Sequence, residues 1–148
     1  MRTTSKIMLL STVAAFGLVA CSSEQDTPEA KPVEEGKATP RLAATYDGGV
    51  RVLDATKLEK VADIPVDGFT RVNDAGDGRH VFVSTSNGFE LLDMGAWSEA
   101  HGDHAHHYSS EPRLTGTSYE GEKPGHVVVH DGNTTLFTDG TGQVRVLD

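Results

Sequence analysis

Four of the seven histidines in this chain lie within seven consecutive residues. Residues 101–107 read His-Gly-Asp-His-Ala-His-His, which places one aspartate among four imidazoles. Neutral imidazole is the commonest metal ligand in proteins, and an ordinary imidazole pKa of about 6.5 leaves it mostly uncharged at neutral pH. This run therefore predicts a site for zinc or a related borderline metal. Its candidate ligands are His101, Asp103, His104, His106 and His107.

The four histidines of this run cannot all face one metal if the segment is extended, because successive side chains then point to opposite sides. His101 and His104 could converge across a turn, and Gly102 would ease that turn. His104 and His106 share a face of an extended segment. Asp103 could be a ligand, or it could be an acceptor that fixes the tautomer of a neighbouring histidine. The sequence leaves both roles of the aspartate open.

Two further histidines follow at the ends of a predicted strand, His-Val-Val-Val-His, over residues 126–130. Period two places His126 and His130 on the same face of this strand. We expect His126 to lie beside the 101–107 run, within one blade, and His130 is a further candidate ligand. Three histidines from the two segments and one carboxylate would complete the roughly four ligands that zinc takes. The alternative is that these histidines are polar surface residues.

The elements that must position these side chains repeat along the chain. Gly-Val-Arg-Val-Leu-Asp at 49–54 matches Gly-Phe-Glu-Leu-Leu-Asp at 88–93, and Val-Arg-Val-Leu-Asp returns at 144–148. Each copy follows a short strand and a tight turn that contains Asp-Gly or Asn-Gly, which is typical of a β-hairpin. The second interval is longer than the first by about the length of an inserted histidine loop. The three copies therefore predict related hairpins with an insertion between the second and the third.

A period near forty residues, with hairpins that end in aspartate, is typical of a β-propeller. The chain has 16 glycines and no sustained helical periodicity, which also favours an all-β fold. We expect residues 40–148 to form two to three blades of a truncated propeller, because closed propellers have four to eight blades. Such a fragment would have unprotected sheet edges. A sandwich of unrelated hairpins is the alternative.

The beginning of the chain predicts export. Arg2 and Lys6 precede an apolar stretch that ends in Leu-Val-Ala-Cys, which resembles a bacterial lipobox. We interpret residues 1–20 as a lipoprotein signal peptide, so that Cys21 is lipidated and anchors the protein to a membrane in the extracytoplasmic cell envelope. Ordinary signal cleavage, with Cys21 as a free thiol, is the alternative. Residues 21–39 are polar and acidic, and we expect a disordered tether.

The charge of the chain excludes one class of partner. Loss of Arg2 and Lys6 with the signal peptide takes the formal net charge from −9 to −11. Nucleic-acid phosphates require clustered lysine and arginine, so we expect no nucleic-acid partner. Strong acidity instead favours cations at long range.

Three stretches of the chain together carry a family resemblance. They comprise Leu91 to Tyr108, which includes Trp97 and the histidine run; Glu122 to His130, which includes Lys-Pro-Gly-His; and Phe137 to Gly142. They resemble the bacterial zinc metallochaperones of the AztD type, and the resemblance spans about residues 41–148. It implies an extracytoplasmic β-propeller that binds zinc and passes it to the solute-binding protein of a zinc ABC importer. It also implies zinc binding at residues 101–107 and His126, and further blades in a complete family member.

We therefore expect a zinc-binding metallochaperone and no enzymatic activity, with a mobile histidine loop that releases its metal by ligand exchange. A zinc hydrolase is one alternative, but the sequence has neither His-Glu-x-x-His nor Gly-x-Ser-x-Gly. Glu122 would be its only candidate base. A metal-independent interaction platform is the other alternative, with Trp97 and Tyr108 as interface anchors. Copper and nickel also accept imidazole, so the identity of the metal stays open.

Overall fold

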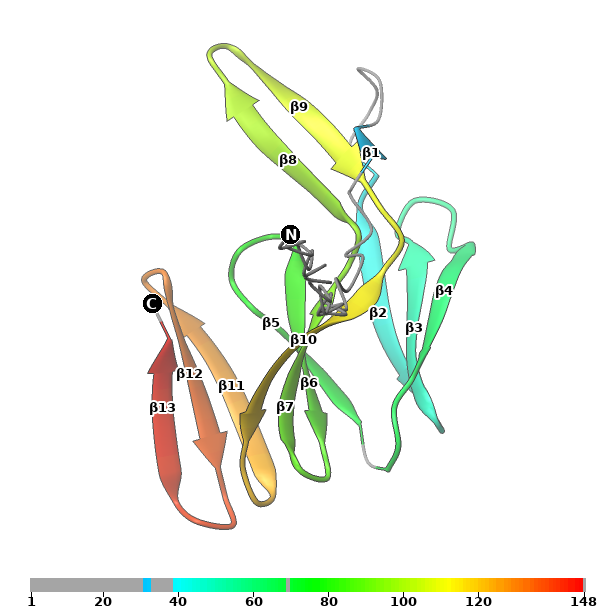
Figure 1. Ribbon diagram of the computed structural model, residues 1–148. Coiled ribbons are helices and arrows are strands. Elements are labelled where there is room, and N and C mark those ends of the chain that lie inside the picture. Colours follow the sequence, from blue (N-terminus) through cyan, green and yellow to red (C-terminus); the bar gives the residue numbers. More distant parts are fainter. Residues whose placement is uncertain (1–30, 33–38, 69, 148) are drawn as a thin grey trace, which may run out of the picture.

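The computed structural model describes residues 31–32, 39–68 and 70–147. All regular elements in these ranges are β-strands, and their sheets are antiparallel (Figure 1), which confirms the predicted all-β class. The predicted signal peptide, Cys21 and most of the predicted tether lie outside the described residues. No helix in the described ranges has the length and apolar character that a membrane crossing requires.

Three sheets follow one another along the described chain, and a hairpin stands apart from them (Figure 1). The first sheet contains β2 (Arg41–Tyr46), β3 (Gly49–Asp54) and β4 (Lys60–Pro65). The second contains β5 (Arg71–Asp74), β6 (His80–Thr85), β7 (Gly88–Asp93) and β10 (Arg113–Glu120). The third contains β11 (Pro124–His130), β12 (Asn133–Thr138) and β13 (Gln143–Leu147). The separate hairpin consists of β8 (Ala96–His101) and β9 (His104–Ser109), with β1 (Lys31–Pro32) paired to β9.

The second sheet has the strand plan of a propeller blade, because its four strands pair in the order β5, β6, β7, β10 as an antiparallel meander. The first sheet has the same plan in three strands, because β2, β3 and β4 correspond to β6, β7 and β10 of the second sheet. A Cβ on Gly49 would lie 2.2 Å from the carbonyl oxygen of Ile64 in β4, and a Cβ on Gly88 would lie 2.1 Å from that of Tyr119 in β10. The first two repeats therefore begin with glycine because the outer strand passes too close for any side chain.

The aspartate that ends each of the first two repeats turns the chain out of its sheet. Oδ1 of Asp54 accepts the backbone N–H groups of Thr56 and Lys57, at 2.8 and 3.0 Å. Oδ1 of Asp93 likewise accepts the N–H of Gly95 at 2.8 Å. A side chain that bonds the backbone two residues on fixes such a turn locally. The aspartates of these two repeats therefore have a structural role, in agreement with the related hairpins that the sequence predicts.

The insertion predicted between the second and third repeats is the β8–β9 hairpin. The chain leaves the second sheet at the end of β7 and returns in β10, where Arg113 pairs with Asp93. The histidine run is thus ordered strand and turn rather than the irregular loop that we expected. Lys31–Pro32, which falls within the predicted tether, is also extended and pairs with β9 at Tyr108 and Ser109.

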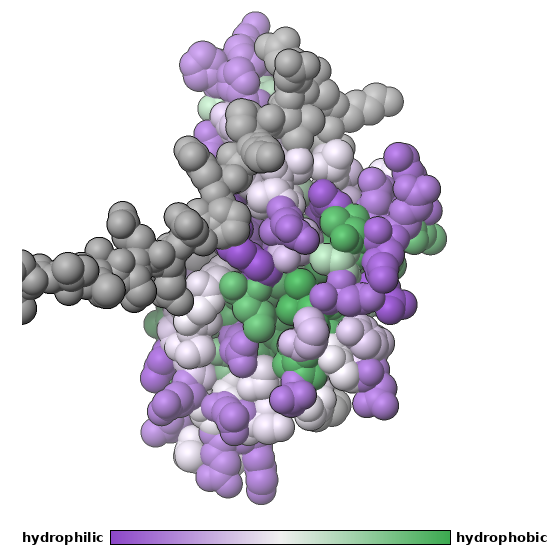
Figure 2. All heavy atoms as spheres, turned by 45° about the vertical axis from the view of Figure 1, so that its right-hand side comes forward, coloured by the Kyte–Doolittle hydropathy of each residue, from purple (hydrophilic) through white to green (hydrophobic). Residues whose placement is uncertain are grey.

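The core lies between successive sheets. One cluster joins β3 to the second sheet through buried Val50, Val52, Val83 and Leu92. The other, which includes Phe82, Phe89 and Leu136, joins the second sheet to the third. Figure 2 shows apolar side chains gathered in the middle of one face, with hydrophilic residues around them and at the projecting top of the molecule. Packing of each sheet against the next is what a propeller requires.

Candidate metal centre

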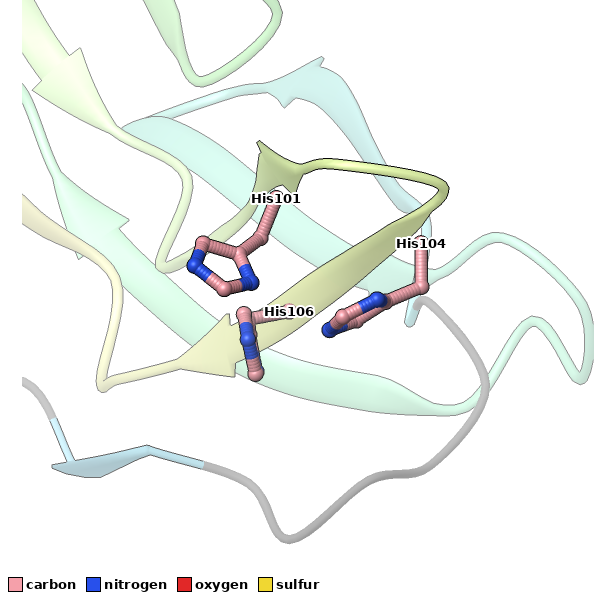
Figure 3. Close-up of side chains that lie close together, drawn as sticks. All are labelled: His101, His104 and His106. Carbon is pink, nitrogen blue, oxygen red and sulfur yellow. The ribbon is translucent and has the colours of Figure 1, made fainter.

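Three imidazoles converge at the tip of the β8–β9 hairpin. One nitrogen from each of His101, His104 and His106 lies within 4.8 Å of the other two. The ring centroids are 5.0 to 5.3 Å apart, and Figure 3 shows the three rings gathered on one side of the hairpin. Zinc binds imidazole nitrogen at about 2.0–2.1 Å, so small side-chain rotations would let the three rings share one ion. We call these three residues the histidine triad.

The backbone of the hairpin accounts for this convergence. His101 and His104 are direct partners across the two strands. Gly102 and Asp103 form the two-residue turn between them, and Gly102 has a φ of 64°, which glycine adopts without steric cost. His106 follows His104 by two residues and so lies on the same face. The predicted convergence of His101 and His104, and the shared face of His104 and His106, are both observed.

The other two candidates of the run have different surroundings. His107 lies on the opposite face of β9, where its Nδ1 is 2.7 Å from the hydroxyl oxygen of Ser98, its cross-strand partner. Asp103 is fully exposed at the turn, and its Oδ1 lies 3.2 Å from Nδ1 of His104. That contact suits an acceptor that orients the imidazole, which leaves Nε2 of His104 for a metal.

His126 and His130 are not brought to the triad. Both belong to β11 in the third sheet, whereas the histidine run belongs to the hairpin inserted in the second, so the two segments do not lie in one blade as expected. Figure 1 shows β11 well away from the hairpin tip. His126 is exposed, in a stretch of β11 where the register with β12 shifts. Nε2 of His130 lies 3.3 Å from Oδ2 of Asp131. Among the described residues, the candidate metal group consists of the triad alone.

The triad face of the hairpin continues toward its root with residues that the sequence analysis did not assign to the site. Glu99 is the cross-strand partner of His106, and its Oε1 accepts a hydrogen bond from Nε1 of Trp97 at 3.2 Å. Trp97 in turn stacks on its own partner Tyr108, with ring centroids 5.2 Å apart and an interplanar angle of 18°. The period-two spacing of Trp97, Glu99 and His101 indicates that they share a strand face. The sequence alone does not show which residues of β9 lie opposite them, because that depends on the strand register.

A partly buried ion pair fixes the root of this face to the second sheet. The guanidinium carbon of Arg79 lies 3.7 Å from the centre of the Trp97 ring. Nη2 of Arg79 is 2.6 Å from Oδ2 of Asp93, and the Asp93 side chain is only 2% exposed. Burial raises the pKa of Asp93, but the hydrogen bonds from Arg79 and from the Gly95 N–H outweigh burial and hold that pKa below its ordinary value. The carboxylate is therefore ionised and paired at neutral pH.

The chain is similar in sequence and in structure to a known zinc chaperone. No protein-family model matches it. Over 100 residues, 66% of the chain, it is 28% identical to the zinc chaperone AztD of Citrobacter koseri, and the match covers 24% of that protein. The crystal structure of Citrobacter koseri AztD matches 72% of the chain with a TM-score of 0.63 and 27% identity. The structure of apo AztD from the same organism covers the same share, with a TM-score of 0.62 and 25% identity.

The chain spans about a quarter of the length of these relatives, or 29% of each solved chain. The predicted resemblance to zinc metallochaperones of the AztD type is confirmed at this level of identity. The all-β fold built from propeller blades is confirmed by the same likeness and by the strand plan of the second sheet.

Proposed function

We propose that this chain, like the zinc chaperone that it resembles, binds Zn²⁺ and delivers it to another protein. The observation that carries the proposal is the histidine triad, with three imidazole nitrogens within 4.8 Å of one another at the tip of one hairpin. Three nitrogen ligands at one hairpin turn are a donor set that suits zinc. Zinc is the cargo here, and the chemistry is ligand exchange in which no covalent bond of a substrate is cleaved.

The position of the triad favours transfer over permanent retention. His101 and His104 are exposed, His106 is partly buried, and the hairpin projects beyond the sheets (Figure 1). A cavity of about 550 Å³ lies at the root of the hairpin, where Arg79 and Trp97 line it, and the triad lies outside it. A receiving protein could therefore approach the metal from the open side and replace the imidazoles one at a time.

The partner that we propose is the solute-binding protein of a zinc ABC importer. The support is the resemblance to the AztD-type chaperones, together with the projecting hairpin that such a partner would have to reach. Transfer from the zinc-loaded chain to that solute-binding protein, measured with the two proteins mixed and with the two separated by a dialysis membrane, tests the step, because direct transfer should be faster when they are mixed. Equal rates in the two arrangements would contradict it.

We further propose that the mature protein is lipid-anchored through Cys21 in the extracytoplasmic envelope. The support is the sequence Leu-Val-Ala-Cys after a short apolar stretch. A radiolabelled fatty acid should be incorporated into the wild-type protein and should not be incorporated into Cys21→Ser. Equal labelling of the two proteins would contradict the anchor.

Zinc affinity, measured by competition with a chromophoric chelator, tests the site. A variant with alanine at His101, His104 and His106 should lose tight binding, because all the ligands that the hairpin tip gathers are gone. A matched variant with alanine at His126 and His130 removes imidazoles from β11 and should bind zinc as the wild type does. Equal affinity of the triad variant and the wild type would overturn the proposed function. If only the β11 variant lost zinc affinity, the metal site would have to be assigned to β11 instead of to the hairpin tip.

A further inference from the structure

Glu99 shares the face of the hairpin that carries the triad, and its carboxylate, which lies outside the group of ligand atoms within 4.8 Å of one another, would have to rotate to reach a shared metal. It is the direct cross-strand partner of His106 and precedes His101 by two residues on the same strand. Both relationships place its side chain on the face that carries the three imidazoles. Zinc takes about four ligands, and the triad supplies three, so one position is left for a donor on this face.

We infer that Glu99 completes the zinc site as its carboxylate ligand, with Trp97 as the residue that orients it. This inference rests on the proposed function of the triad. Oε1 of Glu99 accepts the indole N–H of Trp97 at 3.2 Å. A carboxylate has two oxygens and about four acceptor positions, so Oε2 can bind a metal while Oε1 keeps the indole N–H. Hydrogen-bonded partners of this kind hold a ligating group in position in many metal sites.

Asp103 is the rival carboxylate, and its position is less suitable. It occupies the outer position of the turn, is fully exposed, and contacts the Nδ1 atom of His104. That contact orients an imidazole from the turn itself, whereas Glu99 belongs to the strand face that carries the triad. Glu99, in contrast, lies between the triad and the Trp97–Tyr108 stack, where its indole partner is held by ring stacking.

An anionic fourth ligand changes what the site can hold. Three neutral imidazoles leave a bound Zn²⁺ with its full double charge, and one carboxylate reduces the net charge of the site to a single positive charge. A hard oxygen donor beside three nitrogens also disfavours Cu(I), which prefers soft sulfur ligands. Glu99 therefore gives the hairpin a preference for divalent ions as well as a tighter grip.

The experiment compares zinc affinity in the full chain by chelator competition for the wild type, Glu99→Gln, Asp103→Asn and Glu120→Gln. Glu120 is an exposed residue of β10, and its substitution removes the same charge far from the triad. We expect Glu99→Gln to weaken zinc binding by more than about tenfold and Glu120→Gln not at all. Asp103→Asn should weaken it by less than about threefold, because the amide oxygen of asparagine can still accept a hydrogen bond from His104. Trp97→Phe keeps the aromatic stack but removes the N–H, and it should cost about tenfold.

A second readout separates ligation from a general charge effect. The visible absorption of Co²⁺ bound in place of zinc depends on the number and arrangement of its ligands, so it should change in Glu99→Gln and stay unchanged in Glu120→Gln. Wild-type affinity and an unchanged spectrum in Glu99→Gln would overturn the role of Glu99, as would a larger loss in Asp103→Asn. Those outcomes would not affect the proposal that the triad binds zinc. A wild-type chain with no zinc affinity would instead contradict the proposed function itself.

Discussion

The guanidinium carbon of Arg79 lies 3.7 Å from the centre of the Trp97 ring, which joins the second sheet to the root of the metal hairpin. On its other side the same guanidinium forms a two-contact ion pair with Asp93, at 3.1 Å from Nε and 2.6 Å from Nη2. Trp97 carries this connection to Tyr108 by stacking and to Glu99 by its N–H. The tip of the hairpin is thus oriented by a chain of contacts that begins in the core of the blade.

Removal of Arg79 should destabilise the protein strongly. Arg79→Ala leaves Asp93 as an unpaired charge that is 2% exposed, and loss of one partner of such a pair costs about 3 kcal/mol. Arg51→Ala breaks an exposed pair with Asp63, whose attraction is screened by solvent, and should cost far less. Urea unfolding of the metal-free proteins measures both free energies. Similar losses in the two variants would contradict the structural role of Arg79.

Acid should weaken the same contact. The folded-state pKa of Asp93 is below its ordinary value, which the unfolded chain would show, so the pair contributes stability above that ordinary pKa and loses it as pH falls through the folded pKa. The unfolding free energy of the wild type should therefore fall more steeply below about pH 4 than that of Asp93→Asn. Chemical denaturation between pH 7 and pH 3 measures the difference. Parallel curves would show that Asp93 does not contribute in this way.

The turn at the hairpin tip should require glycine at position 102. Gly102 has a φ of 64° and no atom within 4 Å of an added Cβ, so Gly102→Ala tests backbone strain alone. That strain is about 1 kcal/mol, and it should weaken zinc binding by up to about fivefold because the turn pairs His101 with His104. Gly132 in the β11–β12 turn has a φ of 77° and similarly open surroundings. Gly132→Ala should cost comparable stability and leave zinc affinity unchanged, and an equal affinity loss would count against the tip as the site.

The glycines that begin the first two repeats should be intolerant of any side chain. A Cβ on Gly88 would lie 2.1 Å from the carbonyl oxygen of Tyr119, which belongs to backbone that cannot move aside without breaking the β7–β10 pairing. Gly88→Ala should destabilise the chain by about 3 kcal/mol. Gly49→Ala should do the same in the first sheet. Thermal unfolding compares both with Gly78→Ala, where nothing lies within 4 Å, and an equally small effect at all three positions would contradict the repeat.

Local sequence signals predicted much of the fold and part of the site. Glycine and aspartate in the repeats predicted the hairpins, because turns and close approaches depend on a few adjacent residues. The same local reasoning predicted that His101 and His104 would meet across a turn at Gly102. Glu99 could not be assigned in this way, because its place opposite His106 depends on the register between β8 and β9.

Long-range packing explains the rest of what the sequence did not predict. The contact between Arg79 and Trp97 depends on how the inserted hairpin returns to the second sheet, and no spacing in the sequence encodes that return. The expected convergence of His126 with the histidine run depended on placing both in one blade. The structure places His126 in the next sheet, on a strand that starts after the blade with the insertion is complete.

Zinc K-edge X-ray absorption of the chain loaded with one equivalent of zinc measures the ligands of the bound ion. We expect three imidazole nitrogens among them, and we expect alanine at His101, His104 and His106 to replace these nitrogens by water oxygens or to abolish binding. A spectrum with imidazole ligands that is unchanged by the loss of these three histidines would show that the triad does not hold the zinc.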